Sequence, residues 1–291
     1  MVPGTGDSAG FGEARPVEVV REDIACRRCG YNLRGLGEGG QCPECGAPVT
    51  MSIQGDLLRY ADPRWLAGRW RATRIVVWGQ VSTFLLASQV DPGETSLFAL
   101  VPMLGAMVRY WGGWQVTVAD PVGSERGGLR AYRWTVRVGL AIPIVWSVVR
   151  YFVRVLSFPP IVGTVCFRLG PVVSLIGAVA LFAELSYLAG LVERIPDGAR
   201  VRGLRIWRWA VAGASFVNNS SWSLYSGALA SGGLSMVLIA VLSVTHLITL
   251  VVIGIPYLVI VWRVGTALRE QAAKARGRWA TAARPVQSGS V

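Results

Sequence analysis

The stretch that decides the organisation of this chain is Cys26–Gly46, which reads CRRCGYNLRGLGEGGQCPECG. It holds four of the five cysteines, arranged as two Cys-x2-Cys pairs separated by twelve residues. Two residues between cysteines let both sulfurs reach one ion, and two such pairs complete a tetrahedral shell of four thiolates. The spacing therefore predicts one metal site formed by Cys26, Cys29, Cys42 and Cys45.

The residues around these cysteines predict a small β-hairpin zinc ribbon over residues 24–50. Gly30 and Gly46 directly follow the two pairs, where the chain often needs a positive φ. Pro43 stiffens the second pair, and the glycine-rich residues 35–40 suit a hairpin loop between the pairs. Because four thiolates leave no open coordination position, we expect one structural zinc ion rather than a catalytic one.

The four cysteines allow three other interpretations. The first is a pair of disulfides, which would need an oxidising compartment, whereas the topology derived below places this segment in the cytoplasm. The second is four free thiols. A single iron also fits an S4 shell, and the CGY and CPxCG elements resemble rubredoxins, which are electron carriers. Rubredoxin-like domains place their cysteine pairs further apart around an aromatic core, but Tyr31 is the one aromatic residue between Cys26 and Cys45. Zinc is therefore favoured over iron.

The segment Cys26–Leu36, followed by Cys42–Gly46, resembles the amino-terminal zinc ribbon of uncharacterised membrane proteins of planctomycete-type bacteria. Those proteins usually carry Asp where this chain has Asn32, a departure that leaves the four cysteines intact. The resemblance covers about a tenth of the chain, and the order of ribbon and then membrane domain also matches. It implies a bacterial inner-membrane protein and supplies no activity.

The composition places the chain among membrane proteins. Of its 291 residues, 52% are hydrophobic and only 16% are charged, with a mean hydropathy of +0.45, whereas soluble domains carry about 25% charged residues. The net charge of +12 could suggest nucleic-acid binding, but most arginines flank apolar segments, where lipid headgroups and topology account for them. The ribbon itself is nearly charge-balanced, which also argues against nucleic acid as a partner.

The fold class that we predict is mostly α, a polytopic transmembrane helical bundle with the ribbon at its amino terminus. Residues 1–23 lack periodicity and a signal-peptide pattern, and are predicted to be a disordered tail. Residues 51–74 form a linker and an interfacial amphipathic helix, which begins at Asp62-Pro63. Six apolar segments then predict a transmembrane domain over residues 75–262, with spans at about 75–90, 96–114, 138–156, 171–192, 206–228 and 234–262.

The distribution of basic residues predicts the orientation. The connections at 91–95, 157–163 and 229–233 contain no Lys or Arg, whereas the alternate connections and residues 263–291 are basic. The positive-inside rule then places both termini in the cytoplasm, with the lipid bilayer as the first partner and 263–291 as a basic cytoplasmic tail. In this interpretation Arg109 belongs to the basic connection after the second span.

Four polar residues in the predicted spans are candidates for an intramembrane site: Glu184, His246, Asn218 and Asn219. Ionisable groups in a bilayer are costly and often functional. The alternative is structural, with Glu184 paired to an arginine, His246 bonded across a helix interface, and the Asn218–Ser223 stretch bonding neighbouring helices.

Two function classes follow. In the first, the ribbon docks a cytoplasmic protein partner, and the protein is a membrane-anchored adaptor or regulator. In the second, the polar residues line a path through a small transporter or channel, which an oligomer could also form. Clustering of those residues around one cavity would favour the second class, and dispersal would favour the first. HExxH, GxSxG and P-loop motifs are absent from the sequence, so no enzymatic activity is expected.

Overall fold

The computed structural model describes residues 18–54, 57–87, 100–120, 127–195, 203–230 and 236–282. For some of these, His246 among them, it describes the backbone but not the side chain. Most of the described chain is helical. The chain divides into two compact units, residues 1–55 with 278–291, and residues 56–277. The predicted tail before residue 18 and the last residues from 283 lie outside the described residues.

The first unit is a small module built around the four cysteines. Its described residues form isolated antiparallel bridges, Val19 with Gly37, Ala25 with Asn32 and Gln41 with Pro48, and one short helix, α1 (Thr50–Ile53). Its interior consists of a few aliphatic side chains packed beside buried cysteines: Val20, Leu33, Ala47 and Val49 with Cys26 and Cys42.

Two details of the module differ from the sequence-based prediction. Its described residues form no continuous hairpin strand, and two of the three bridges lie within the separate cysteine turns. The module also begins earlier than residue 24. The backbone N–H of Val20 donates to the Leu36 carbonyl and the Val20 carbonyl accepts from Gly35, so residues 18–23, predicted as tail, belong to the module.

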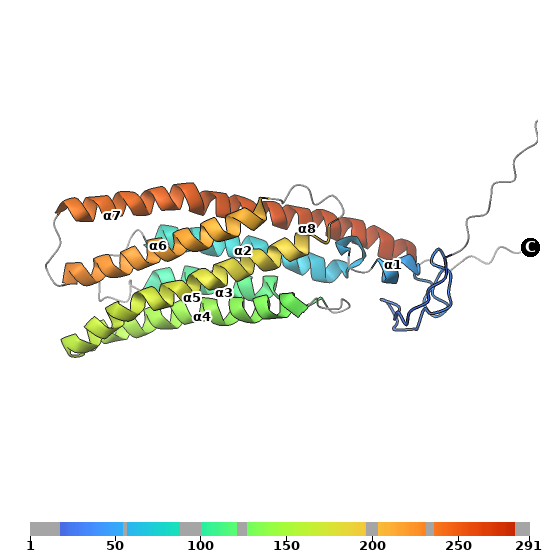
Figure 1. Ribbon diagram of the computed structural model, residues 1–291, viewed down its shortest axis with the longest axis horizontal. Coiled ribbons are helices and arrows are strands. Elements are labelled where there is room, and N and C mark those ends of the chain that lie inside the picture. Colours follow the sequence, from blue (N-terminus) through green and yellow to red (C-terminus); the bar gives the residue numbers. More distant parts are fainter. Residues whose placement is uncertain are drawn as a thin grey trace, which may run out of the picture. The chain divides into compact units, whose positions relative to one another are not determined.

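The second unit is a bundle of long helices that run along one common direction (Figure 1). After the 3-10 turn η1 (Leu58–Tyr60), its elements are α2 (Pro63–Ala87), α3 (Val101–Val116), α4 (Gly127–Val155), α5 (Pro160–Val192), α6 (Leu204–Ala230), α7 (Met236–Thr249), the π-helical turn η4 (Leu250–Gly254) and α8 (Ile255–Ala282). The end of α8, from Arg278, is grouped with the first unit.

Helix α2 starts where the Asp-Pro step predicted a helix start. The Asp62 carboxylate accepts hydrogen bonds from the backbone N–H of Arg64, at 2.6 Å, and of Trp65, as expected for an N-cap. The predicted interfacial helix is continuous with the first apolar segment in α2, and one of its faces is buried in the bundle. Trp65 donates to the Val118 carbonyl, and Arg69 donates to the carbonyls of Gln115 and Val118. The two side chains therefore bind backbone carbonyls at the carboxyl end of α3 and just beyond it.

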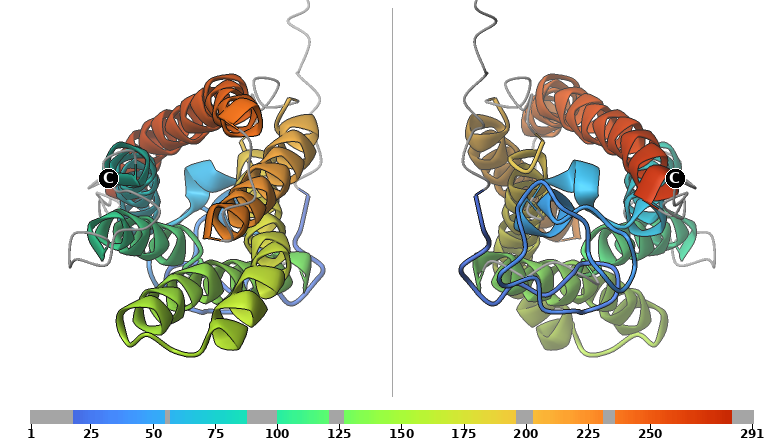
Figure 2. Two further views of the ribbon diagram at one scale, coloured as in Figure 1. Left: turned by 90° about the vertical axis from the view of Figure 1, so that its left-hand side faces the viewer. Right: turned by 90° about the vertical axis from the view of Figure 1, so that its right-hand side faces the viewer.

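Consecutive helices pack against each other around the bundle, α2 with α3, α3 with α4, and onward to α6 with α7. The end-on views show α2 and α3 on one side, α5 and α6 on the other, and α4 and α8 between them (Figure 2). Gly265 of α8 lies against Thr73 and Trp70 of α2 and closes this ring.

Helices α2 and α3 approach each other closely at glycine residues. A Cβ on Gly79 would clash with the backbone of Arg109, and a Cβ on Gly112 would lie 2.7 Å from the Val76 backbone nitrogen. Small residues let helix backbones approach in lipid, where van der Waals packing replaces the hydrophobic effect as the force between helices. This contact fixes the position from which the Arg109 side chain enters the bundle.

In the described residues, three helical stretches are long and apolar enough to cross a membrane: Leu129–Val155, Ile161–Val192 and Leu247–Ala280. They correspond to the third, fourth and sixth predicted spans. Helices α2, α3 and α6 overlap the other three predicted spans. Several arginines in α2, and arginine, Asn and Ser residues in α6, make these two helices less apolar. The 16 residues of α3 rise about 24 Å at about 1.5 Å per residue, less than a bilayer core of about 30 Å.

The bundle has an apolar interior and also exposes large apolar side chains on its outside. Large apolar side chains such as Trp78, Leu85, Trp111 and Ile206 are exposed on its surface, while Arg109 and Glu184 are buried inside. Soluble proteins rarely expose extended apolar surface, and polar groups in membrane bundles face the interior. Together with the three long apolar helices, this indicates a membrane protein.

Replacing Gly79 with alanine should destabilise the bundle, because the new methyl group meets the α3 backbone rather than a movable side chain. We expect a cost of about 1–3 kcal/mol, measured as a lower thermal unfolding temperature of the protein in detergent. Gly68→Ala is the matched control on the same helix, since a Cβ there meets open space, and it should leave stability unchanged or slightly raised. Equal effects at the two positions would contradict the close α2–α3 contact.

Candidate metal centre and intramembrane cavity

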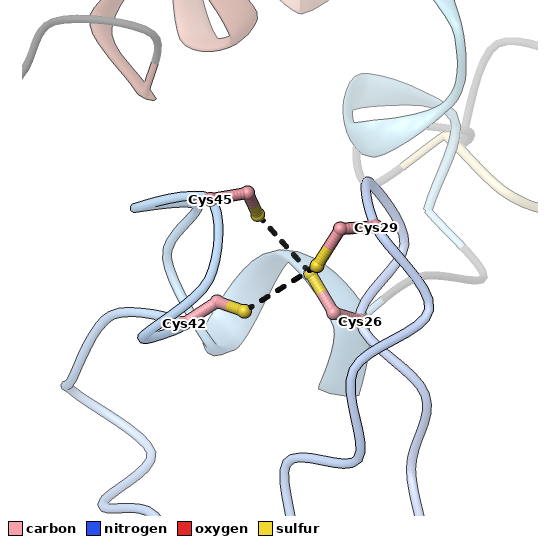
Figure 3. A group of neighbouring side chains, drawn as sticks. All are labelled: Cys26, Cys29, Cys42 and Cys45. Atoms are coloured by element: carbon pink, nitrogen blue, oxygen red, sulfur yellow. Dashed lines mark hydrogen bonds between the residues drawn. The ribbon is translucent and has the colours of Figure 1, made fainter.

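The four cysteines of the first unit converge on one point (Figure 3). Their sulfur atoms all lie within 4.8 Å of one another, and the pairs Cys26–Cys45 and Cys29–Cys42 are each 3.6 Å apart. Four thiolates bound at about 2.3 Å to one tetrahedral ion would be about 3.8 Å apart. The cluster can therefore hold a metal ion with little movement.

The two cysteine turns have the same backbone geometry. In each, the first cysteine donates its N–H to the carbonyl five residues later, Cys26 to Tyr31 and Cys42 to Ala47. The glycine four residues after that cysteine donates back to its carbonyl, and Gly30 and Gly46 have φ values of +81° and +68°. This is the left-handed conformation that glycine adopts at no steric cost. The glycine prediction is confirmed.

The thiols of the module differ in pKa. Burial opposes ionisation of Cys26, but hydrogen bonds from the backbone N–H groups of Arg28 and Cys29 and from neighbouring thiols lower its pKa to about 7. Burial, together with neighbouring cysteines, raises the pKa of Cys45 to about 12. Since the thiolate is the metal-binding form, these four sulfurs cannot all ionise near neutral pH unless a cation compensates their charge.

The second unit has a buried polar cluster that joins four helices. Arg109 of α3 donates from Nη2 to Glu184 Oε2 of α5 at 2.6 Å and to the Tyr257 hydroxyl of α8 at 3.0 Å. Its Nε donates to Gln80 Oε1 of α2 at 2.8 Å. Glu184 is 0% exposed, Tyr257 4% and Arg109 7%. A charged pair at this depth requires mutual neutralisation, because each ion alone would cost several kcal/mol to bury.

Next to this cluster lies a cavity of about 290 Å³, called here the bundle cavity. Helices α2 to α7, the turn η4 and α8 all contribute to its wall. Its polar lining residues are Gln80, Thr83, Arg109, Tyr110, Ser215, Asn218, Asn219, Thr249 and Tyr257, and its apolar ones include Phe84, Leu140, Ile144, Leu181 and Ile253. An apolar pocket with a few convergent polar groups is the usual form of a small-molecule site.

Two irregular turns of helix also line the bundle cavity. Pro143 lies within α4, and a proline removes the hydrogen bond that its N–H would donate one turn back. The π-helical turn η4 contributes Ile253 and Gly254, and Thr249 lies just before it. Irregular backbone at membrane depth is tolerated where it is buried in protein or lines a cavity, and π-helical turns are frequent at functional sites.

The structure brings together most of the predicted intramembrane residues. Asn218 and Asn219 line the bundle cavity, and Glu184 lies behind its wall, bonded to Arg109 and Tyr257. The structural alternative for Glu184, a pairing with an arginine, is confirmed by the same contact. His246 belongs to α7, but its side chain lies outside the described ones.

Sequence reasoning missed three residues of the cluster, Gln80, Arg109 and Tyr257. The assignment of Arg109 to a basic loop is wrong, since the residue lies within α3 and is buried. A signal was available: Arg109 falls inside the second predicted span, and a lone arginine and a lone glutamate in two spans are natural partners. Gln80 and Tyr257 could not be singled out in this way. Both are uncharged, and side chains with a polar tip are common on helices.

The cysteine cluster leads to a metal prediction. Purified without added metal, the protein should contain one metal ion per chain by elemental analysis. Cys42→Ser should lose it, because three thiolates and a hydroxyl bind a soft ion less tightly. Cys166→Ser, which removes the cysteine in α5 outside the cluster, should retain the ion. Full metal content in Cys42→Ser would contradict the site.

The buried ion pair leads to a stability prediction. Arg109→Met leaves the Glu184 carboxylate without its cationic partner and should cost about 3–5 kcal/mol of stability, measured by thermal unfolding in detergent. The double variant with Glu184→Met should recover much of that loss, because it removes both charges. Arg205→Met is the control, since Arg205 pairs with Glu193 at the exposed surface, where ion pairs contribute little. A double variant no more stable than Arg109→Met would contradict the pairing.

Comparisons of the chain with protein-family models, with curated proteins and with solved structures find no match. The inferences about its function therefore rest on the geometry of the metal centre and of the bundle cavity.

Proposed function

We propose that this chain is an integral inner-membrane protein that binds a small molecule inside its helical bundle, as transporters and channels do, and that carries a structural zinc module. The observation that carries the proposal is the bundle cavity, where Asn218 and Asn219 of α6 meet Arg109 of α3, itself bonded to Glu184. Clustering of this kind is what distinguishes a solute site from polar residues that only join helices.

The proposed topology has six spans with both termini in the cytoplasm. Helices α4 and α5 and the stretch Leu247–Ala280 are candidate spans by length and hydropathy. The packing of α2, α3 and α6 into the same bundle supports three more. Removing Arg109 from the basic loops leaves the alternation of basic and uncharged connections unchanged, so the positive-inside argument still favours cytoplasmic termini.

Zinc is the proposed ion of the cysteine cluster. The 3.6 Å sulfur separations suit a tetrahedral S4 shell, which zinc or iron could occupy. The interior of the module is aliphatic, with Leu33 and Val49 fully buried, and Tyr31 is 40% exposed. An aromatic core of the rubredoxin kind is therefore lacking in the described part of the module, and this supports a structural zinc ion.

A second candidate, the adaptor or regulator, is supported by the surface of the module. A groove of about 670 Å³ is lined by Val19, Val20, Ile24 and Ile53 together with Glu18, Glu22, Glu38 and Arg21, and Val19 is 45% exposed. Three carboxylates against one guanidinium give the groove an acidic excess, which suits a basic segment of a partner protein. Photo-crosslinking from position 19 in cells tests this candidate, which fails if no discrete adduct forms.

The small-molecule proposal predicts that the bundle cavity is accessible to water-soluble reagents. In a Cys166→Ser background, Asn218→Cys should react with a small hydrophilic methanethiosulfonate reagent in membranes, because position 218 lines the cavity. Labelling is measured by mass spectrometry relative to the background protein.

Val217→Cys is the matched control on the same helix. Val217 is 55% exposed on the bundle and does not line the cavity, so in a bilayer it faces lipid, where a thiol stays protonated and reacts slowly. Labelling of position 217 at least as fast as of position 218 would contradict a solute-accessible cavity.

A further inference from the structure

The charges around the bundle cavity limit what it can bind. Among the described residues that line it, Arg109 alone is charged. Its charge is compensated by Glu184, which does not line the cavity. The site is therefore polar but close to electroneutral before any ligand enters.

Arg109 nevertheless keeps part of its hydrogen-bonding capacity. A guanidinium has five N–H groups. Nε is used by Gln80, and Nη2 is used by Glu184 and Tyr257. Nη1 has no hydrogen-bond partner among the described residues. Arg109 lines the cavity. The two N–H groups on its Nη1, called here the Nη1 edge, can therefore donate hydrogen bonds to a ligand oxygen.

The surrounding contacts hold this donor edge rigidly. Gln80, Glu184 and Tyr257 come from three different helices and fix the guanidinium on its other two nitrogens. The backbone of Arg109 is itself pressed against Gly79. A donor that is held in place before binding loses little conformational entropy when a ligand arrives.

Helix α6 supplies the second set of polar groups. Ser215, Asn218 and Asn219 are spaced so that they share one helix face, and all three line the cavity. The amide of Asn219 donates to the Ser215 hydroxyl at 3.2 Å. Amides both donate and accept hydrogen bonds without carrying charge, so this wall recognises polarity rather than charge.

We propose that the bundle cavity binds a small neutral amphipathic molecule that presents a carbonyl or amide oxygen to Arg109 Nη1 and an apolar group to Phe84, Leu140 and Ile144. An anion would leave one uncompensated negative charge inside the bundle, and a cation would find no carboxylate on the described cavity wall; both situations cost several kcal/mol in a low-dielectric interior. The volume of about 290 Å³ is at the lower limit of ligand pockets, about 300–1,000 Å³. This inference names the ligand class of the proposed function and rests on it.

Three probes of nearly one shape test the inference: benzamide, benzoate and benzamidine, which are neutral, anionic and cationic at neutral pH. Binding of each to the full-length protein in nanodiscs is measured by ligand-observed NMR. We expect benzamide to bind at least about tenfold more tightly than either charged probe. Tighter binding of benzoate or benzamidine, or no binding of benzamide, overturns the inference.

Two variants on α6 locate the binding. Ser215→Phe fills the cavity and should abolish benzamide binding, whereas Val217→Phe on the exposed face should leave it unchanged. Equal loss in both variants would place the probe elsewhere. If Asn218→Cys is labelled by the hydrophilic reagent but benzamide does not bind, the ligand class is wrong and the proposed function stands. If neither occurs, both fail.

Discussion

The ion pair between Arg109 and Glu184 is the constraint on which the membrane unit depends. An apolar bundle cannot hold either charge alone, because desolvation of a single ion costs several kcal/mol. The 2.6 Å contact between them requires α3 and α5 to approach at one depth, and the bonds from Arg109 to Gln80 and Tyr257 extend the same requirement to α2 and α8. One guanidinium thus sets the relative positions of four helices.

Glycine makes that arrangement sterically accessible. With Gly79 and Gly112 at the α2–α3 contact, the two backbones meet directly, and the Arg109 side chain is directed inward beside Gln80. A larger residue at either position would push the helices apart and move the guanidinium away from its acceptors. The hydrogen bonds of Arg109 therefore depend on close packing of the two helix backbones. Such packing is a main source of helix association in lipid, which supplies no hydrophobic force between helices.

The first unit, the cysteine module, depends on its four cysteines more than on a buried core. Its described interior has only a few aliphatic residues, too few for a small domain to be stable on burial alone, and such domains commonly depend on a metal or disulfides. Two cysteine turns of the same geometry bring four sulfurs to one point. The pKa of Cys26 is lowered and that of Cys45 is raised from the ordinary thiol value, and a bound cation would favour the thiolate form of both. Binding of a metal ion by the four cysteines would therefore be coupled to the folding of the module.

Local sequence determined those features of this protein that depend on neighbouring residues. The Cys-x2-Cys spacing, Gly30 and Gly46, and the Asp62 cap act within a few residues, and the structure has each of them as predicted. The membrane character followed from composition, because it is a property of the chain as a whole. Composition alone does not determine the number of spans. In the described residues, three of the six predicted segments lack the length or hydropathy of a span.

Only the tertiary structure decided where the polar residues meet. Arg109 and Glu184 are 75 residues apart, and Arg109 and Tyr257 are 148 apart. No local rule relates such positions. Periodicity indicates that a helix exists but not which of its neighbours a given face contacts, so the sequence could identify Glu184 and Asn218 as unusual without assigning their partners. The bundle cavity, the role of Arg109 and the spare Nη1 edge come from the packing of separate helices, which depends on shape complementarity between surfaces far apart in the chain.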